Sequence, residues 1–304
     1  MRYLLLLRTL RITRRLARLA ALGACAAACS ERQPATTSAV TDDFGDTLRI
    51  GPAPTRIVSL NPTTTELLFA IGAGPRVVGR TSYDIFPAEV RGVADLGQGL
   101  RPNVEAVLAV HPDLVLLYAS ADNRDAARRL RAAGVATAAY RIDRIADMVR
   151  VTLLLGRLSA DTAAAQRTVD SVGATLERVR KATATLPHPT LFWPLWESPL
   201  LSVGRGSFLN ELIDIAGGRN VFADLPQPSP TVTFEELLRR DPDMIVASDA
   251  SRKRLEANDR FQTLRAMREH HFATIDSTVA TGPSARVGAS AVALARLLHP
   301  GVTF

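Results

Sequence analysis

The sequence predicts an α/β protein of two αβ lobes joined by a single long backbone helix, with a ligand cleft between the lobes. The first observation is an uninterrupted amphipathic helix over residues 159–182. Its apolar face recurs at spacings of four and three, at Ala165, Val169, Val172, Leu176 and Val179. At about 1.5 Å per residue, this helix is on the order of 35 Å long, enough to run along two small domains.

The second observation is a repeat on the two sides of this helix. Glu235 lies 130 residues after Glu105, as Asp243 does after Asp113. Each copy predicts a short helix opened by a carboxylate, a Pro-Asp turn and a buried strand. One such connection is common in αβ proteins, but two copies around a central helix indicate two like lobes.

The positive charge of the chain is concentrated at its start. The formal net charge is +7, and residues 1–24 hold six arginines and no acidic residue. Removing those six leaves 31 basic residues against 30 acidic ones, so the remainder gives no reason to expect a nucleic-acid partner. A basic stretch followed by a short apolar one and small residues is typical of a secretory signal peptide, which we assign to residues 1–24.

The end of this signal, Leu22-Gly23-Ala24-Cys25, resembles a bacterial lipoprotein signal. The resemblance implies that Cys25 carries a lipid anchor to the membrane, with Cys29 as the alternative. A disulfide between the two is the other reading. Because these are the only cysteines of the chain, the folded lobes hold no disulfide framework. Residues 25–48, polar and small, are expected to be a lipidated tether.

The N-terminal lobe is expected over residues 49–158. A strand at 56–60 precedes a helix in which Thr63 and Glu66 have capping-box spacing, and Gly72 and Gly74 end that helix. There follow a strand at 77–81, the first repeat, a helix at 126–133, a strand at 136–140 and a helix at 145–158. Alternating strands and helices predict a mostly parallel sheet.

The connecting helix is assigned to residues 159–186 and the C-terminal lobe to 187–304, because Pro187 and Pro189 prevent the helix from continuing. The expected elements are strands from 190 and at 200–203, a helix at 208–216, the second repeat, a charged helical region at 251–268, a strand at 273–276 and a helix at 284–298. Clefts outside the carboxyl ends of parallel strands bind ligands, which predicts a site between the lobes.

Three groups of these residues carry a family resemblance: the run 56–66, Val104-Glu105 with its Pro112-Asp113 turn, and Gly204 with the segment 208–220. Together they look like the periplasmic binding proteins for cobalamin and iron complexes, the helical-backbone substrate-binding components of ABC importers. The resemblance covers residues 49–300. It implies a monomer with a rigid bridging helix, little hinge closure, an ABC permease as partner, and no cofactor.

The resemblance also implies a role for the repeat glutamates. In such proteins one exposed carboxylate on each lobe docks onto arginines of the permease, and Glu105 and Glu235 match those positions. Carboxylate–arginine contacts are charge-assisted and often bidentate, and two separated ones fix an orientation. Alternatively, each glutamate only favours a helix N-terminus, which is worth about 0.3–1 kcal/mol.

For the ligand, the resemblance points to loops that follow the strands. The candidate ligand-binding residues are Asn61, Pro62, Tyr83, Asp84, Gln98, Arg101, Tyr118, Trp193, Trp196 and Arg205. Aromatic faces would stack on a macrocycle or catecholate, and the arginines would answer negative charge. The two tryptophans share one side only if a strand extends through Pro194, and otherwise they pack within the lobe.

The identity of the ligand stays open between cobalamin, haem and an iron siderophore. Tyr83 matches a ligand-contacting aromatic of the cobalamin binders, but Gly97 and Pro230 stand where tryptophans are expected. The five histidines are scattered, so a direct metal-ion site is not expected. An enzyme is not expected either, because no Gly-x-Ser-x-Gly or complete dinucleotide loop occurs. A ligand sensor without a transport role remains the alternative.

Overall fold

A five-stranded parallel sheet forms the centre of the N-terminal lobe in the computed structural model, which describes residues 39–49, 51–277, 279 and 282–303. The strand order is β5-β4-β3-β6-β7. The strands are β3 (Ile57–Ser59), β4 (Val77–Arg80), β5 (Ala94–Asp95), β6 (Leu114–Tyr118) and β7 (Ala136–Tyr140). Every pairing is parallel, as the alternation of strands and helices predicts.

Helices cover both faces of this sheet. They are α2 (Pro62–Ala70), α3 (Val104–Ala109), α4 (Arg124–Ala132) and α5 (Ile145–Leu158), with 3-10 turns η1 (Gly74–Arg76), η2 (Ala88–Gly92) and η3 (Ala121–Asn123). Side chains of β6 alternate between two cores. Leu114 and Leu116 pack with α2 and α5, whereas Val115 and Leu117 pack with α3 and α4. A strand buried on both faces therefore needs the continuous apolar run seen in the sequence.

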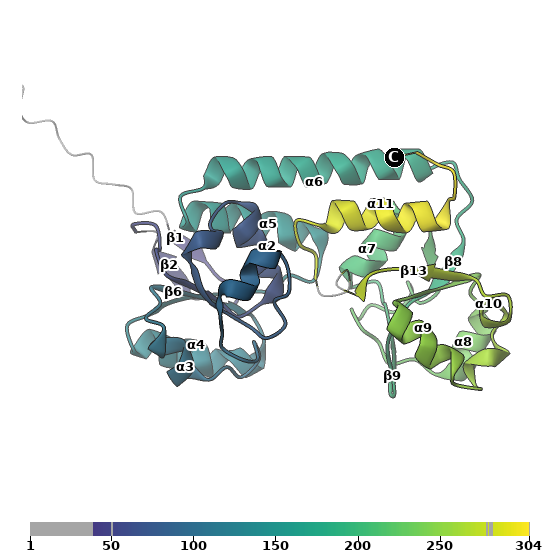
Figure 1. The fold of residues 1–304 in the computed structure, drawn as a ribbon, viewed down its shortest axis with the longest axis horizontal. Helices are drawn as coiled ribbons and strands as arrows, with labels where there is room; N and C mark the ends of the chain where they lie inside the picture. Colours follow the sequence, from purple (N-terminus) through teal and green to yellow (C-terminus); the bar gives the residue numbers. More distant parts are fainter. Residues whose placement is uncertain (1–38, 50, 278, 280–281, 304) are drawn as a thin grey trace, which may run out of the picture. The chain divides into compact units, whose positions relative to one another are not determined.

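The long helix α6 (Thr162–Thr183) packs against both lobes. It lies along α5 at one end and along α11 (Val287–Leu298) at the other (Figure 1), and it also contacts α7 (Phe208–Ile215). Its buried residues include Ala165, Val172, Leu176 and Val179, which belong to the predicted apolar face. One hydrophobic core thus continues from the first lobe, under α6, into the second.

The C-terminal lobe has a four-stranded parallel sheet in the order β11-β8-β12-β13. Its strands are β8 (Thr190–Phe192), β11 (Arg219–Asn220), β12 (Met244–Ala247) and β13 (Phe272–Thr274), and β9 (Pro194–Glu197) pairs antiparallel with β10 (Leu200–Ser202). Leu191 and Val246 face the core with α7 and α11. Phe192 and Ile245 face α8 (Phe234–Arg240), α9 (Asp249–Glu256), η4 (Phe261–Thr263) and α10 (Arg265–Arg268).

The two Pro-Asp repeats have the same structural role. The Asp113 carboxylate accepts hydrogen bonds from the Thr55 amide and hydroxyl at 2.7 and 2.9 Å. The Asp243 carboxylate accepts the same pair of bonds from Thr190 at 2.8 and 2.7 Å. Each aspartate therefore fixes the start of the adjacent central strand, β3 or β8. The residues before the two prolines both take positive φ, at His111 (48°) and Asp241 (39°).

The structure differs from the expected tether at residues 39–48. There, β1 (Ala39–Thr41) and β2 (Thr47–Arg49) form an antiparallel hairpin. The Asp42 carboxylate accepts hydrogen bonds from the amides of Phe44, Asp46 and the distant Ala139. The fixed part of the chain thus begins before residue 49, because a polar segment finds a partner on β7.

The predicted signal and both candidate lipidation sites, Cys25 and Cys29, lie outside the described residues. Within the part of the chain that the structure does describe, no helix is both long enough and apolar enough to span a bilayer.

Candidate functional site

A cavity of about 470 Å³ opens between the two lobes. One wall consists of residues that follow the strands of the first sheet: Leu60, Asn61, Pro62 and Thr63 after β3, Thr81 and Tyr83 after β4, Gln98, Gly99 and Leu100 after β5, Tyr118 at the end of β6, and Ile142 and Asp143 after β7. The other wall comprises Leu195, Ser207, Phe208, Leu209, Pro228, Ser229 and Gly282. The cavity therefore lies at the carboxyl edge of the sheet, where open α/β sheets bind ligands. Its volume is typical of small-molecule sites.

A second cavity, of about 660 Å³, is larger but differently placed. It is walled by α2, η1 and η2, and it meets β4 at Val77, the first residue of that strand. It also includes the ion pair between Glu66 and Arg286. Because it reaches the amino end of the strand rather than the carboxyl edge, we take the cavity between the lobes as the candidate site.

The first turn of α2 forms one corner of the site. The Asn61 side chain accepts a hydrogen bond from the Thr63 amide at 2.9 Å and so caps the helix. Pro62 is the first helical residue, where its missing N–H costs nothing. The hydroxyls of Ser59 and Thr64 lie 2.7 Å apart behind this turn. Local hydrogen bonds therefore fix the corner before any ligand binds.

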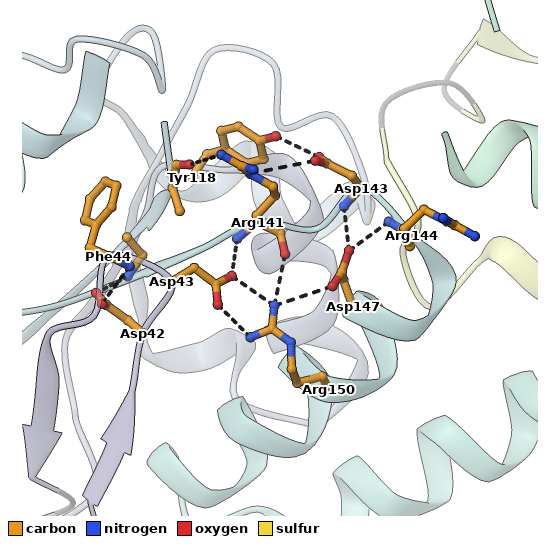
Figure 2. Close-up of polar contacts among 11 residues, drawn as sticks. Asp42, Asp43, Phe44, Tyr118, Arg141, Asp143, Arg144, Asp147 and Arg150 are labelled. Carbon is orange, nitrogen blue, oxygen red and sulfur yellow. Dashed lines mark hydrogen bonds and ion pairs between the residues drawn. The ribbon is translucent and has the colours of Figure 1, made fainter. Parts of the chain in front are cut away.

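Tyr118 and Asp143 form the most polar part of the wall. The Tyr118 hydroxyl donates to Asp143 Oδ1 at 2.7 Å, as Figure 2 shows. Burial, and then this carboxylate, raise the pKa of the Tyr118 phenol well above its usual value, so the phenol remains a donor. The Asp143 carbonyl accepts from the Phe208 amide of α7 at 2.8 Å, which ties this loop to the second lobe.

Tyr83 and Asp84 are adjacent in sequence but have different surroundings. Tyr83 is exposed and lines the cavity. Asp84 is buried behind the wall, where its Oδ2 accepts from the Thr81 amide at 2.8 Å. Burial raises the pKa of the Asp84 carboxyl above its ordinary value. Asp84 therefore shapes the loop that presents Thr81 and Tyr83, and it is not among the residues that line the cavity.

Four other predicted ligand residues lie outside the cavity lining. Arg101 makes an ion pair with Asp122 at 2.7 Å, and Arg205 is exposed. Trp193, which lies between β8 and β9 in the sequence, is buried in the hydrophobic core. Trp196 is exposed on β9, where its indole N–H donates to the Ser198 carbonyl at 2.9 Å. The lining therefore brings together Asn61, Pro62, Tyr83, Gln98 and Tyr118 of the ten candidates.

The two repeat glutamates occupy equivalent places on the two lobes. Glu105 lies in the first turn of α3 and Glu235 in the first turn of α8, with 74% and 76% of their side chains exposed. Figure 1 shows α3 and α8 at the ends of their lobes away from α6. Each carboxylate pairs with one arginine of its own lobe, Arg129 at 2.6 Å and Arg260 at 2.8 Å.

The comparison with known families decides the identity of the fold. A model of the family described as periplasmic binding protein matches residues 57–279. The chain belongs to this family. The resemblance and the two-lobe α/β architecture predicted from the sequence are therefore confirmed. The members of the family are substrate-binding proteins.

Individual relatives extend over most of the chain. An uncharacterised ABC transporter substrate-binding lipoprotein of Bacillus subtilis, YvrC, is 26% identical over 269 residues, which cover 86% of this chain and 85% of that protein. A vitamin B12-binding protein of Vibrio cholerae is 27% identical over 197 residues, 64% of this chain and 70% of that one. The solved structure of a periplasmic haem-binding protein from Pseudomonas aeruginosa shares the fold, with a TM-score of 0.75 at 22% identity, covering 82% of this chain and 94% of that one.

Some lining residues of this binding protein were not predicted from the sequence. Asp143 follows β7 at the same sheet edge as the predicted residues, so the rule that singled out Asn61 would also have found it. Ser207 and Phe208 begin α7 and enter the site from the second lobe. In the described part of the chain, no cluster of three or more histidine, cysteine or acidic side chains is arranged to hold a metal ion.

Proposed function

We propose that this protein is the extracytoplasmic substrate-binding component of an ABC importer. It captures cobalamin or an iron complex, either a ferric siderophore or haem, and delivers this ligand to the permease. The observation that carries the proposal is the cavity between the lobes, at the carboxyl edge of a periplasmic-binding-protein sheet. The relation to the lipoprotein YvrC and to the vitamin B12-binding protein supports both parts of it.

The proposed role is binding and delivery by a monomer, without catalysis. A lipid anchor at Cys25, or alternatively at Cys29, would keep the protein at the outer face of the membrane. Because α6 packs against both lobes and one core continues beneath it, we expect only small hinge motion when a ligand enters.

Docking to the permease is assigned to Glu105 and Glu235. Support comes from their exposure, their equivalent positions and their placement on the side of the lobes away from α6 (Figure 1). In each pair the arginine donates a hydrogen bond to Oε1, and the two glutamate side chains are 74% and 76% exposed. A permease arginine would bind these exposed carboxylates by a charge-assisted hydrogen bond.

Calorimetric titration tests the ligand class. The full-length chain, purified in detergent, is titrated with cyanocobalamin, haemin and several ferric siderophores. We expect saturable binding of one ligand per chain by one of these classes. If none of them binds, corrinoids and iron complexes are ruled out as the cargo.

An uptake assay tests docking. In cells that lack the chromosomal copy, the double variant Glu105→Ala/Glu235→Ala should bind the ligand found by calorimetry with unchanged affinity but support no uptake. Glu177→Ala is the matched control, since Glu177 is exposed on α6 and pairs with Arg180 of the same helix. Normal uptake with the double variant would remove the docking role and leave the ligand assignment intact.

A further inference from the structure

The charge of the cavity lining is unusual for a site that would hold an anion. Among the described residues that line it, Asp143 is the one acidic or basic side chain. The remaining polar groups are the neutral side chains of asparagine, glutamine, serine, threonine and tyrosine. A carboxylate without a lining cation disfavours an anionic ligand by like-charge repulsion, and it favours a ligand that carries a donor or a positive charge.

Asp143 is held in place with part of its acceptor capacity left over. Oδ1 accepts from the Tyr118 hydroxyl at 2.7 Å, and the Asp143 amide donates to Asp147 Oδ2 at 3.2 Å. Oδ2 forms an ion pair with Arg141 Nε at 3.8 Å, a separation too long for a hydrogen bond. With 29% of its side chain exposed, this carboxylate can accept a further hydrogen bond from a ligand in the cavity.

Two of the three nearby arginines, Arg150 and Arg144, pair with carboxylates outside the cavity. In Figure 2, Arg150 forms a two-bond contact with Asp43 of the hairpin, at 2.9 Å for each bond. Arg144 pairs with Glu211. The Arg141 side chain is 62% exposed and forms an ion pair with Asp143 at 3.8 Å, and none of these three arginines belongs to the cavity lining. The guanidinium groups of Arg144 and Arg150 are therefore committed to carboxylates outside the cavity, and Arg141 contacts Asp143 from outside the lining.

Two helix N-termini also face the cavity, and such ends attract anions when their N–H groups are free. Here they are largely satisfied from within the protein. The Thr63 amide of α2 donates to Asn61 Oδ1 at 2.9 Å. In α7, the Leu209 amide donates to Ser207 Oγ at 3.2 Å and the Phe208 amide to the Asp143 carbonyl. The positive ends of these helices thus offer little to offset the charge of Asp143.

We propose that the cavity selects an uncharged or cationic ligand that donates a hydrogen bond to Asp143, and that it discriminates against anionic chelates. This inference rests on the proposed function and narrows it. Uncharged corrinoids and neutral or cationic ferric hydroxamates remain as cargo. Ferric catecholates, which present several negative charges, are excluded as cargo. Haem, which presents two carboxylates, is excluded as well.

The test compares four probes of different charge on the full-length chain by calorimetry. Cyanocobalamin has no net charge and many amide donors, ferrioxamine B is a cationic ferric hydroxamate, haemin carries two carboxylates, and a ferric tris-catecholate is strongly anionic. The tightest probe should be one of the first two, by at least about tenfold over either anion, which corresponds to about 1.4 kcal/mol. The tightest binding by haemin or the tris-catecholate would overturn the inference but leave the proposed function standing. Binding of none would overturn both.

Variants then test whether Asp143 is the cause. Asp143→Asn should weaken the tightest probe about tenfold and reduce the discrimination against the anions. Asp125→Asn is the matched control, because it removes the same charge from an exposed ion pair with Arg128 and should change neither. Tyr118→Phe, which keeps the carboxylate, should preserve the order of the probes. Unchanged discrimination in a folded Asp143→Asn variant would contradict the inference. If that variant does not fold, the probe order of wild type and Tyr118→Phe still decides.

Discussion

The ion pair between Glu66 and Arg286 joins the two lobes, and Glu66→Gln should loosen that connection. Glu66 lies on α2, with 7% of its side chain exposed, and Arg286 directly precedes α11, with 25% exposed. The guanidinium donates to both carboxylate oxygens, at 2.9 and 2.8 Å. It also stacks over the Phe86 ring at 4.4 Å. The hydrogen bonds that Arg286 donates to the Glu66 carboxylate raise the pKa of the guanidinium, and an arginine stays charged in a protein without such a partner.

The size of the effect follows from what the substitution leaves behind. Removing one partner of a buried ion pair costs about 3–5 kcal/mol, because the other charge remains buried. Glutamine keeps one acceptor oxygen, part of Arg286 reaches solvent, and Asp276 also attracts the guanidinium. We therefore expect a loss of about 2 kcal/mol in the free energy of unfolding. For a chain of this size, that lowers Tm by about 4 °C.

Thermal unfolding followed by circular dichroism measures this shift on the full-length chain at neutral pH. Glu177→Gln is the control, since it removes the same charge from an exposed pair within α6 and should leave Tm unchanged. If Glu66→Gln matches the wild type as closely as the control does, the reasoning that this pair couples the lobes is wrong.

Three further predictions concern the sheet anchors, the cavity wall and the core. Hydrogen bonds from Thr190 lower the pKa of Asp243 to about 2, so its contribution is present above about pH 4 and is lost as pH falls toward 2. With 45% of that side chain exposed, we discount the shift to about 1 kcal/mol and expect Asp243→Asn to lower stability by that amount at pH 7 in urea titrations, with the gap closing near pH 2. Gly99→Ala should reduce ligand affinity by at least about tenfold in calorimetry, because its Cβ would overlap a backbone carbonyl of the cavity wall, whereas Gly92→Ala meets nothing within 4 Å and should bind normally. Phe192→Ala should cost about 3–5 kcal/mol of unfolding free energy, since the ring is fully buried and packs edge-to-face against Phe222. A loss below about 1 kcal/mol would contradict that packing.

The elements that the sequence predicts best are those whose signal is local. The helix predicted at residues 145–158 has these same bounds in the structure, as α5. The continuous apolar run at 114–116 predicts β6, because a strand covered on both faces needs no alternation. Because these patterns involve only residues that are close in the sequence, the helix and the strand can be predicted without knowledge of the tertiary contacts.

The features that sequence reasoning missed depend on distant partners. The hairpin at residues 39–49 is polar and short, and Asp42 fixes it by accepting from Ala139, almost one hundred residues away. The two tryptophans illustrate the same limit. Pro194 interrupts the strand pattern between them, so alternation could not assign their faces, and the structure buries Trp193 and exposes Trp196. Asp143 was missed although it obeys the same strand-end rule as Asn61.

The repeat explains why two lobes with little sequence in common can present equivalent carboxylates. In each copy, the aspartate of the Pro-Asp turn fixes the start of the central strand, and the glutamate opens the helix eight residues before it. The turn therefore sets the position of the helix, and hence of Glu105 and Glu235, relative to the sheet. Each glutamate is further oriented by an arginine from a later element, Arg129 or Arg260. We therefore expect the proposed docking surface to be fixed by the cores of the lobes, with a geometry that does not depend on the ligand. Recognition of the proposed cargo would then rest with the cavity alone, where the two lobes contribute different residues.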